Sequence, residues 1–224
     1  MENTVFIALI QFVAVLLSLS FHECAHAWTA DRLGDPTARF LGRVSLNPIV
    51  HSELWGTIIF PLICLQFGFM FGWAKPVPVN VGRLRNPVRD HMLVAAAGPV
   101  SNMILALFMF GILLAMKVAS PELAAIVRSV TYGGLPSGGV AVPIALIAYY
   151  GMIINVILAL FNLIPIAPLD GAAVLSGLLP RGLAASLDRL QSYSIFIFVL
   201  LLFSGIPQLL FDPPIVALRR MLTT

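Results

Sequence analysis

Apolar residues gather along the chain in long runs that contain no charged side chain, and short polar stretches separate these runs. Four runs lack Asp, Glu, Lys and Arg altogether, and they cover residues 3–21, 54–74, 92–116 and 190–211. A fifth uncharged stretch covers residues 129–169. Because a transmembrane helix needs about 20 mostly apolar residues, this pattern predicts an all-α polytopic membrane protein.

Glycine and proline mark where the expected helices end. The triplet Gly34-Asp35-Pro36 is a typical helix stop, which ends the first helix near residue 33. About four transmembrane helices are expected in all, over residues 4–33, 92–116, 140–164 and 192–211.

The run 54–74 differs from the others because three glycines and a proline interrupt it. It is followed by Lys-Pro-Val-Pro-Val-Asn at residues 75–80. The alternation of this stretch favours extended backbone, while its prolines restrict it to a sheet edge or a turn. We therefore expect 54–74 to be a re-entrant, partly extended segment.

Composition supports the membrane assignment. The 224 residues are 59% hydrophobic and only 10% charged, whereas a soluble domain carries about 25% charged residues. We expect a single membrane-embedded domain over residues 1–224. The net charge of +3 comes from basic residues scattered among short loops, which gives no case for nucleic acid binding. Glu2 is the only charge before the first run, so this run does not have the basic start of a signal peptide.

The strongest chemical signal is the motif His22-Glu23-x-x-His26 in the first expected helix. Residues four apart lie on one face of a helix, so both imidazoles can reach one metal ion. Glu23 lies beside them, where a carboxylate can take a proton from a zinc-bound water. The alternative is a pair of core histidines near a carboxylate. Ionisable groups inside a membrane are costly and usually functional, which favours the metal site.

A catalytic zinc ion normally has three protein ligands and an open position. Asp170 is the main candidate for the third ligand, because it is the first charged residue after the long uncharged stretch. Pro165 and Pro168 precede it and interrupt the helix, and such backbone is tolerated at membrane depth only in a protein-lined or wet cavity. The alternative is an ordinary Asp-Gly turn at the membrane surface.

The proposed ligands constrain the topology. If every apolar run crossed the membrane, His26 and Asp170 would lie in opposite leaflets. A re-entrant 54–74 makes the first helix and the 140–164 helix parallel, and it brings both residues to one depth. It also places most basic residues on one face, as the positive-inside rule favours. We expect a multi-pass plasma membrane protein with the N-terminus outside and the active site nearer the cytoplasmic face.

Several further motifs occur in an order typical of one enzyme family. They are Leu46-Asn47-Pro48, residues 72–80, Ala97-Gly98-Pro99-x-Ser101-Asn102 and Asn162-x-x-Pro165-x-x-Pro168-x-Asp170-Gly171. Together with the histidine motif, they resemble the site-2 protease family of intramembrane zinc metalloproteases, specifically its small prokaryotic members without a PDZ domain. Two departures, Ala167 and Ala172-Ala173, bear on substrate choice rather than on the metal site.

This resemblance implies an intramembrane zinc endopeptidase that hydrolyses peptide bonds in or near the transmembrane segments of substrate proteins. It implies that His22, His26 and Asp170 bind one Zn²⁺ and that Glu23 is the general base acting on a zinc-bound water. The expected partners are membrane-spanning protein substrates and the lipid bilayer. Asn102 and Asn162 match polar residues near the active site that help to position substrate, although a hydrogen bond between helices explains Asn102 equally well.

Other interpretations stay open at this point. A transporter or metal channel could use the same four residues as an ion pathway, and a non-catalytic relative could keep the fold. The presence of Glu23 argues against pure zinc binding, which would not require it. His51 and Glu53 could form a second metal site or belong to a polar interfacial loop, and His91 is expected at the surface. Neither the substrate nor the oligomeric state follows from the sequence.

Overall fold

The computed structural model describes residues 2–65, 72–137, 139–180, 183 and 193–224. Within these ranges all regular structure is helical, which confirms the predicted all-α class. Three of the described helices are long and apolar enough to cross a membrane. They are α1 (Glu2–Arg32), α5 (Pro87–Ala119) and α7 (Ala141–Asn162).

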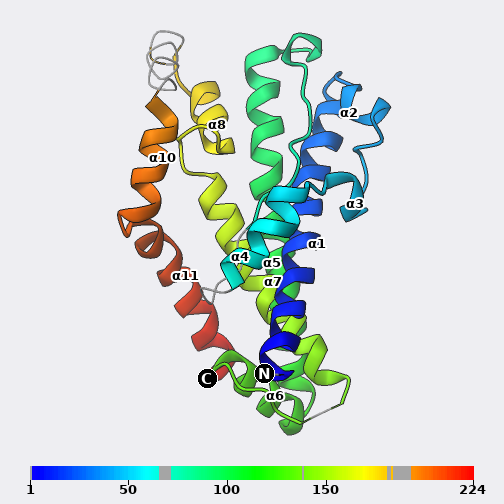
Figure 1. The fold of residues 1–224 in the computed structure, drawn as a ribbon, viewed down its shortest axis with the longest axis vertical. Helices are drawn as coiled ribbons and strands as arrows, with labels where there is room; N and C mark the ends of the chain where they lie inside the picture. The colour runs from blue at the N-terminus through cyan, green and yellow to red at the C-terminus, as the bar shows by residue number, and fades with distance from the viewer. Residues whose placement is uncertain (1, 66–71, 138, 181–182, 184–192) are drawn as a thin grey trace.

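These three helices form the body of the molecule. α1 and α7 run in the same direction, and α5 runs in the opposite direction and packs against both (Figure 1). The parallel course of α1 and α7 is the arrangement that the metal-site argument required. The main apolar core lies where α5, α6 (Pro121–Thr131) and α7 meet, and its fully buried side chains include Leu113, Val127, Leu146 and Met152.

The expected helix over 192–211 is divided in two; its residue 192 lies outside the described ranges. α10 (Ser194–Phe203) and α11 (Ile206–Thr223) are separated at Gly205, whose φ of 76° is in the left-handed region. Glycine adopts this conformation at little cost, so the chain turns at Gly205 and α10 ends just before it. α10 has 10 residues and is about 15 Å long, so it does not cross a bilayer unaided. A fourth spanning helix therefore stays a prediction.

Short helices connect the long ones and carry much of the site. Between α1 and α5 the chain forms α2 (Thr37–Phe40), α3 (Pro48–His51), the π-helix η1 (Leu54–Ile59), α4 (Phe60–Leu65) and the 3₁₀ turn η2 (Val81–Arg83). After α7, residues 163–169 are irregular, and α8 (Asp170–Leu178) follows.

The two ends of the 54–74 segment meet. The backbone N–H of Trp73 donates to the carbonyl of Gly56 at 3.0 Å, and that of Lys75 donates to the carbonyl of His51 at 2.8 Å. A Cβ atom on Gly56 would lie 2.3 Å from Nε1 of Trp73, so glycine is needed for this approach. Residues 66–71 lie outside the described ranges, but these two hydrogen bonds bring the chain back to where the segment began. Residues 72–80 have no regular secondary structure and run as a drawn-out segment (Figure 1), which agrees with the expected re-entrant, partly extended path.

Candidate metal centre

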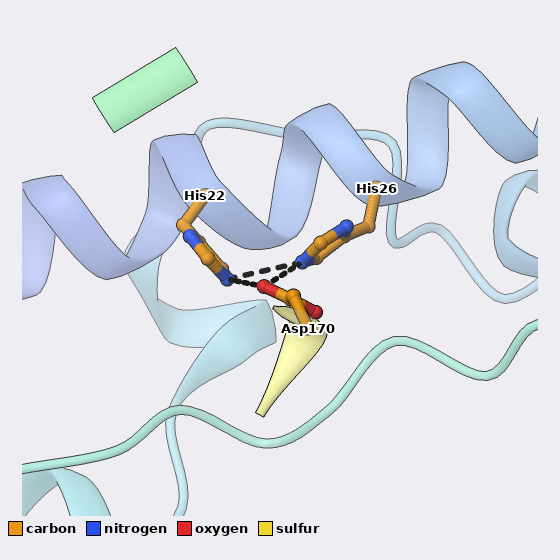
Figure 2. Close-up of side chains that lie close together, drawn as sticks. All are labelled: His22, His26 and Asp170. Carbon is orange, nitrogen blue, oxygen red and sulfur yellow. Dashed lines mark hydrogen bonds and ion pairs between the residues drawn. The ribbon is translucent and has the colours of Figure 1, made fainter. Parts of the chain in front are cut away.

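His22 and His26 lie on one face of α1, and both side chains are buried. Their Nε2 atoms are 3.0 Å apart, as the spacing of four residues predicts for a helix. Figure 2 shows both imidazoles pointing at the carboxylate of Asp170, which comes from α8. The structure therefore brings together the three residues that the sequence analysis selected as metal ligands.

Asp170 occupies the first position of α8, a separate helix, rather than the end of the preceding helix. Its Oδ2 atom lies 3.1 Å from Nε2 of His22 and 3.4 Å from Nε2 of His26. A Cβ atom on Gly171 would lie 2.4 Å from the carbonyl oxygens of Leu163 and Ile164. Glycine at this position thus allows α8 to begin directly against the end of α7, which directs Asp170 at α1.

The proton positions on the two imidazoles follow from their neighbours. Nδ1 of His26 lies 2.7 Å from the carbonyl of Val94, which can only accept, so this nitrogen carries the proton. Nδ1 of His22 lies 2.6 Å from Oδ1 of Asn102. The Nδ2 group of Asn102 donates to the carbonyl of Ser18 and to Oδ1 of Asn155, so its Oδ1 is an acceptor and His22 donates to it. Both Nε2 atoms are then free to bind a metal.

The three converging atoms fit a zinc ion. Oδ2 of Asp170 is buried and accepts no hydrogen bond within the described part of the chain. The separations of 3.0, 3.1 and 3.4 Å are close to the distance of about 3.3 Å between ligands around tetrahedral zinc at 2.0–2.1 Å.

Asn102 lies behind His22, away from the metal-facing atoms, and is fully buried. Its amide group connects three helices through His22 and Ser18 on α1 and Asn155 on α7. Asn155 also donates to the hydroxyl of Ser18 at 2.7 Å. The sequence analysis missed Ser18 and Asn155; the signal available was two polar residues inside apolar helices.

Gly98 of α5 lies directly against the imidazoles. A Cβ atom at this position would be 2.5 Å from Cε1 of His22 and from both Cε1 and Nε2 of His26. No larger residue fits without moving a histidine. This contact gives a physical reason for the Gly98-Pro99 pair that the sequence analysis noted only as a motif.

A cavity of about 710 Å³ opens beside the candidate metal centre. Its wall is mostly apolar, with contributions from α1, α7, α8 and the extended segment 72–80. Glu23, Asn162 and His91 also line it. The expected surface position of His91 is therefore only partly correct, because its half-buried side chain faces this cavity. Asn162 donates to the carbonyl of Leu158 at 2.9 Å, one turn earlier in α7.

Glu23 is held by the extended segment. The backbone N–H of Val77 donates to Oε2 of Glu23 at 2.9 Å. Three residues later, the N–H of Asn80 donates to Oδ2 of the buried Asp35 at 2.6 Å. Burial raises the pKa of Asp35, but its hydrogen bonds with Thr37 and Asn80 bring it below its ordinary value. One carboxylate within α1 and one just after its end therefore bind the same segment.

His51 and Glu53 do not form a second metal site. Nε2 of His51 lies 2.7 Å from the carbonyl of Ser45, and Glu53 accepts a hydrogen bond from Nε1 of Trp73 at 3.0 Å. Across the described ranges, His22, His26 and Asp170 are the one group of three or more potential ligand residues close enough to share an ion. His51 and Glu53 instead hold the ends of the re-entrant segment, which agrees with the alternative of a polar interfacial loop.

Comparison with known proteins finds relatives that cover most of the chain. The model of Peptidase family M50 matches residues 10–205. The chain is 37% identical over 191 residues to the protein named "Putative zinc metalloprotease YwhC" from Bacillus subtilis strain 168, covering 84% of this chain and 78% of that relative. It is 29% identical over 205 residues to "Putative zinc metalloprotease Rip2" from Mycobacterium tuberculosis H37Rv, covering 88% and 71%.

A third relative, also named "Putative zinc metalloprotease Rip2", comes from Mycolicibacterium smegmatis and is 26% identical over 187 residues, covering 84% of this chain and 64% of the relative. No solved structure matches the chain. The family match covers most of the sequence, including every residue of the candidate metal centre. The chain belongs to peptidase family M50, the site-2 protease family, and is a zinc metalloendopeptidase.

Proposed function

We propose that this protein cleaves peptide bonds within or next to the membrane-spanning segments of substrate proteins. One observation carries the proposal: His22 and His26 belong to the apolar helix Thr4–Arg32, and the cavity beside them has a mostly apolar wall. A site for soluble peptides has no need of such surroundings, whereas a substrate helix arriving through the bilayer remains in an apolar environment. We further propose that residues 1–224 act as a single membrane-embedded domain.

His22, His26 and Asp170 would hold one zinc ion. Their unprotonated Nε2 atoms and buried carboxylate oxygen are the donor set that zinc prefers. When bound, zinc supplies a Lewis acid that polarises a carbonyl group and increases the acidity of water. The bond from His22 to Asn102 keeps the first imidazole in the tautomer that leaves Nε2 free. Asn102 would therefore orient a ligand rather than touch the substrate.

Glu23 would act as the general base. It lies between the two histidines in sequence and lines the cavity in which the substrate is bound. Its Oε2 atom accepts from Val77, so the second carboxylate oxygen is available to take a proton from the attacking water. The same group would return this proton to the leaving amine. Asn162, which also lines this cavity, would help to position the substrate backbone.

A substrate helix must unwind locally before its peptide bonds can be attacked. The extended residues 72–80 would hold the opened segment by edge pairing. The backbone groups of Trp73, Lys75 and Val77 already have partners, whereas Val79 has no backbone hydrogen bond within the described ranges. Val79→Pro should reduce cleavage of a membrane-spanning reporter. Unchanged cleavage of this reporter would contradict the pairing role.

The topology follows the same proposal. Most of the basic residues lie at the end of the bundle where α1 finishes and α5 begins, and the positive-inside rule assigns this end to the cytoplasm. The N-terminus would then be outside the cell. The protein would reside in the plasma membrane with its active site nearer the cytoplasmic face.

The first test is the zinc content of detergent-purified protein. We expect about one zinc per wild-type chain, none in the His22→Ala/His26→Ala double variant, and weakened binding in Asp170→Ala. Glu23→Gln should keep zinc and lose cleavage, both of fluorescein-labelled casein and of a single-span reporter in proteoliposomes. Folded wild-type protein without zinc would overturn the ligand assignment. Cleavage of casein without cleavage of the reporter would overturn the intramembrane part alone.

A further inference from the structure

Arg43 is a buried arginine whose guanidinium group faces only backbone carbonyls. Nη2 donates to the carbonyls of Lys75 at 2.6 Å and Pro76 at 3.0 Å, and Nη1 donates to the carbonyl of Val50. Within the described ranges it forms no ion pair with a carboxylate. A buried charge without a counter-charge is costly, so its placement against two segments of backbone calls for an explanation.

The next backbone group after these carbonyls belongs to the site. Arg43 binds the carbonyls of residues 75 and 76, and the N–H of Val77 donates to Glu23. The two contacts are therefore adjacent along one extended segment. The same guanidinium also binds Val50 at α3, which connects this segment to the loop after α1.

The composition of the segment explains why an arginine is needed. Pro76 and Pro78 have no N–H group, so they cannot anchor the segment as donors. The N–H groups of Lys75 and Val77 already donate to His51 and Glu23, so the carbonyls of residues 75 and 76 are the groups left to bind. The planar guanidinium presents several donors that can reach them at once. Lysine is a compact point donor and cannot reproduce this geometry.

We propose that Arg43 is a positioning residue for the general base: it fixes residues 75–76 so that the N–H of Val77 holds the Glu23 carboxylate. This inference rests on the proposed role of Glu23. Arg43 contacts neither the metal ligands nor Glu23 directly, so its effect on the reaction passes through the backbone of the segment.

The experiment measures zinc content, kcat and KM for Arg43→Ala, Val77→Pro and the double variant, with fluorescein-labelled casein in detergent as substrate. Val77→Pro removes the N–H that binds Glu23. We expect each single variant to keep zinc, to lower kcat at least tenfold and to leave KM within about threefold. The double variant should fall within about threefold of Val77→Pro alone, because both changes interrupt the same connection.

Two further variants complete the set. Arg39→Ala is the matched control, because Arg39 lies four residues earlier in α2, is exposed and pairs with Asp31. It should leave kcat unchanged. Arg43→Lys keeps the positive charge but loses the several donors of the planar guanidinium group. This variant should fold, bind zinc and lower kcat at least threefold. It also provides the measurement if Arg43→Ala does not fold.

Four outcomes would overturn the inference. They are wild-type kcat in a folded Arg43 variant, loss of zinc from the Arg43 variants, an increase in KM alone, and multiplicative effects in the double variant. Glu23→Gln separates this failure from failure of the proposed function. If Glu23→Gln abolishes cleavage while Arg43→Lys and Arg43→Ala do not, only the positioning role is wrong. If Glu23→Gln retains cleavage, the assignment of the base is wrong.

Discussion

Nδ1 of His22 lies 2.6 Å from Oδ1 of Asn102, and this hydrogen bond joins α1 to α5 at the candidate metal centre. Both groups are buried, and the amide of Asn102 is oriented by Ser18 and Asn155. The bond therefore sets the tautomer of a candidate metal ligand from a neighbouring helix. The histidine motif of α1 and a polar residue 80 positions later in α5 therefore belong to one hydrogen-bonded site.

Asn102→Ala should weaken zinc binding by about 10- to 100-fold, the range typical of lost partners of metal-binding histidines. The measurement is competition for zinc against a chelator in detergent. Asn162→Ala is the control for affinity, because Asn162 contacts Leu158 rather than a ligand. Equal zinc affinity in wild type and Asn102→Ala would show that His22 needs no such partner.

Gly98→Ala should disrupt the metal centre, because the added methyl group would lie 2.5 Å from both imidazoles. We expect loss of zinc and of cleavage. Gly111→Ala is the matched control on the same helix, since a Cβ atom there meets nothing within 4 Å. It should retain zinc and activity. Full zinc occupancy in Gly98→Ala would mean that α5 can move away at little cost.

Asp35 should make the folded protein sensitive to acid. Its pKa is lowered in the folded state, so its contribution to stability is present above the unfolded pKa of about 3.9 and is lost as pH falls through the folded value. Asp35→Asn places an amide against N–H donors and should cost about 1–3 kcal/mol at neutral pH. Thermal inactivation midpoints of both proteins should converge as the pH falls from about 5 to below 4. A constant difference across this range would contradict the assignment.

Because hydrogen bonds join the two ends of the 54–74 segment, both ends should be labelled from the same side of the membrane. In a background without Cys24 and Cys64, cysteines introduced at Ser52 and Lys75 should react with a membrane-impermeant maleimide from the same side. A cysteine at Tyr132, directly after α6, should react from the other side, because α6 lies at the end of the bundle opposite α2 (Figure 1). Labelling of the first two positions from opposite sides would show that the segment spans the membrane.

Asn162 provides a test of substrate positioning. Its side chain lines the cavity without contacting a metal ligand. Asn162→Ala should lower kcat/KM for casein by about 10-fold while zinc content stays near that of wild type. Unchanged kcat/KM would remove Asn162 from the site and leave it as a residue that only caps the end of α7.

Part of the candidate site was predictable because its signals are local. The spacing of His22 and His26 is set by the geometry of one helix, and their rarity in an apolar run made them conspicuous. Asp170 was predictable for a different reason, since the two histidines require a third ligand at the same depth. This requirement also led to the re-entrant path of 54–74, which the hydrogen bond between Trp73 and Gly56 supports.

The contacts of Asn102 with Asn155, of Arg43 with residues 75–76, and of Glu23 with Val77 could not be predicted in this way. Each joins segments far apart in the chain, and no local periodicity records such a pairing. The break at Gly205 was also missed, because a glycine within an apolar run is compatible with both a helix and a turn.

The sequence by itself determined the class of protein, the helices α1, α5 and α7, and the three residues that converge at the candidate metal centre. These follow from apolar run length, helix spacing and the cost of charge in a membrane, all of which act along the chain or at one position. Only the tertiary structure decided which backbone and amide groups hold His22 and Glu23, because buried polar groups find their partners through the packing of distant segments.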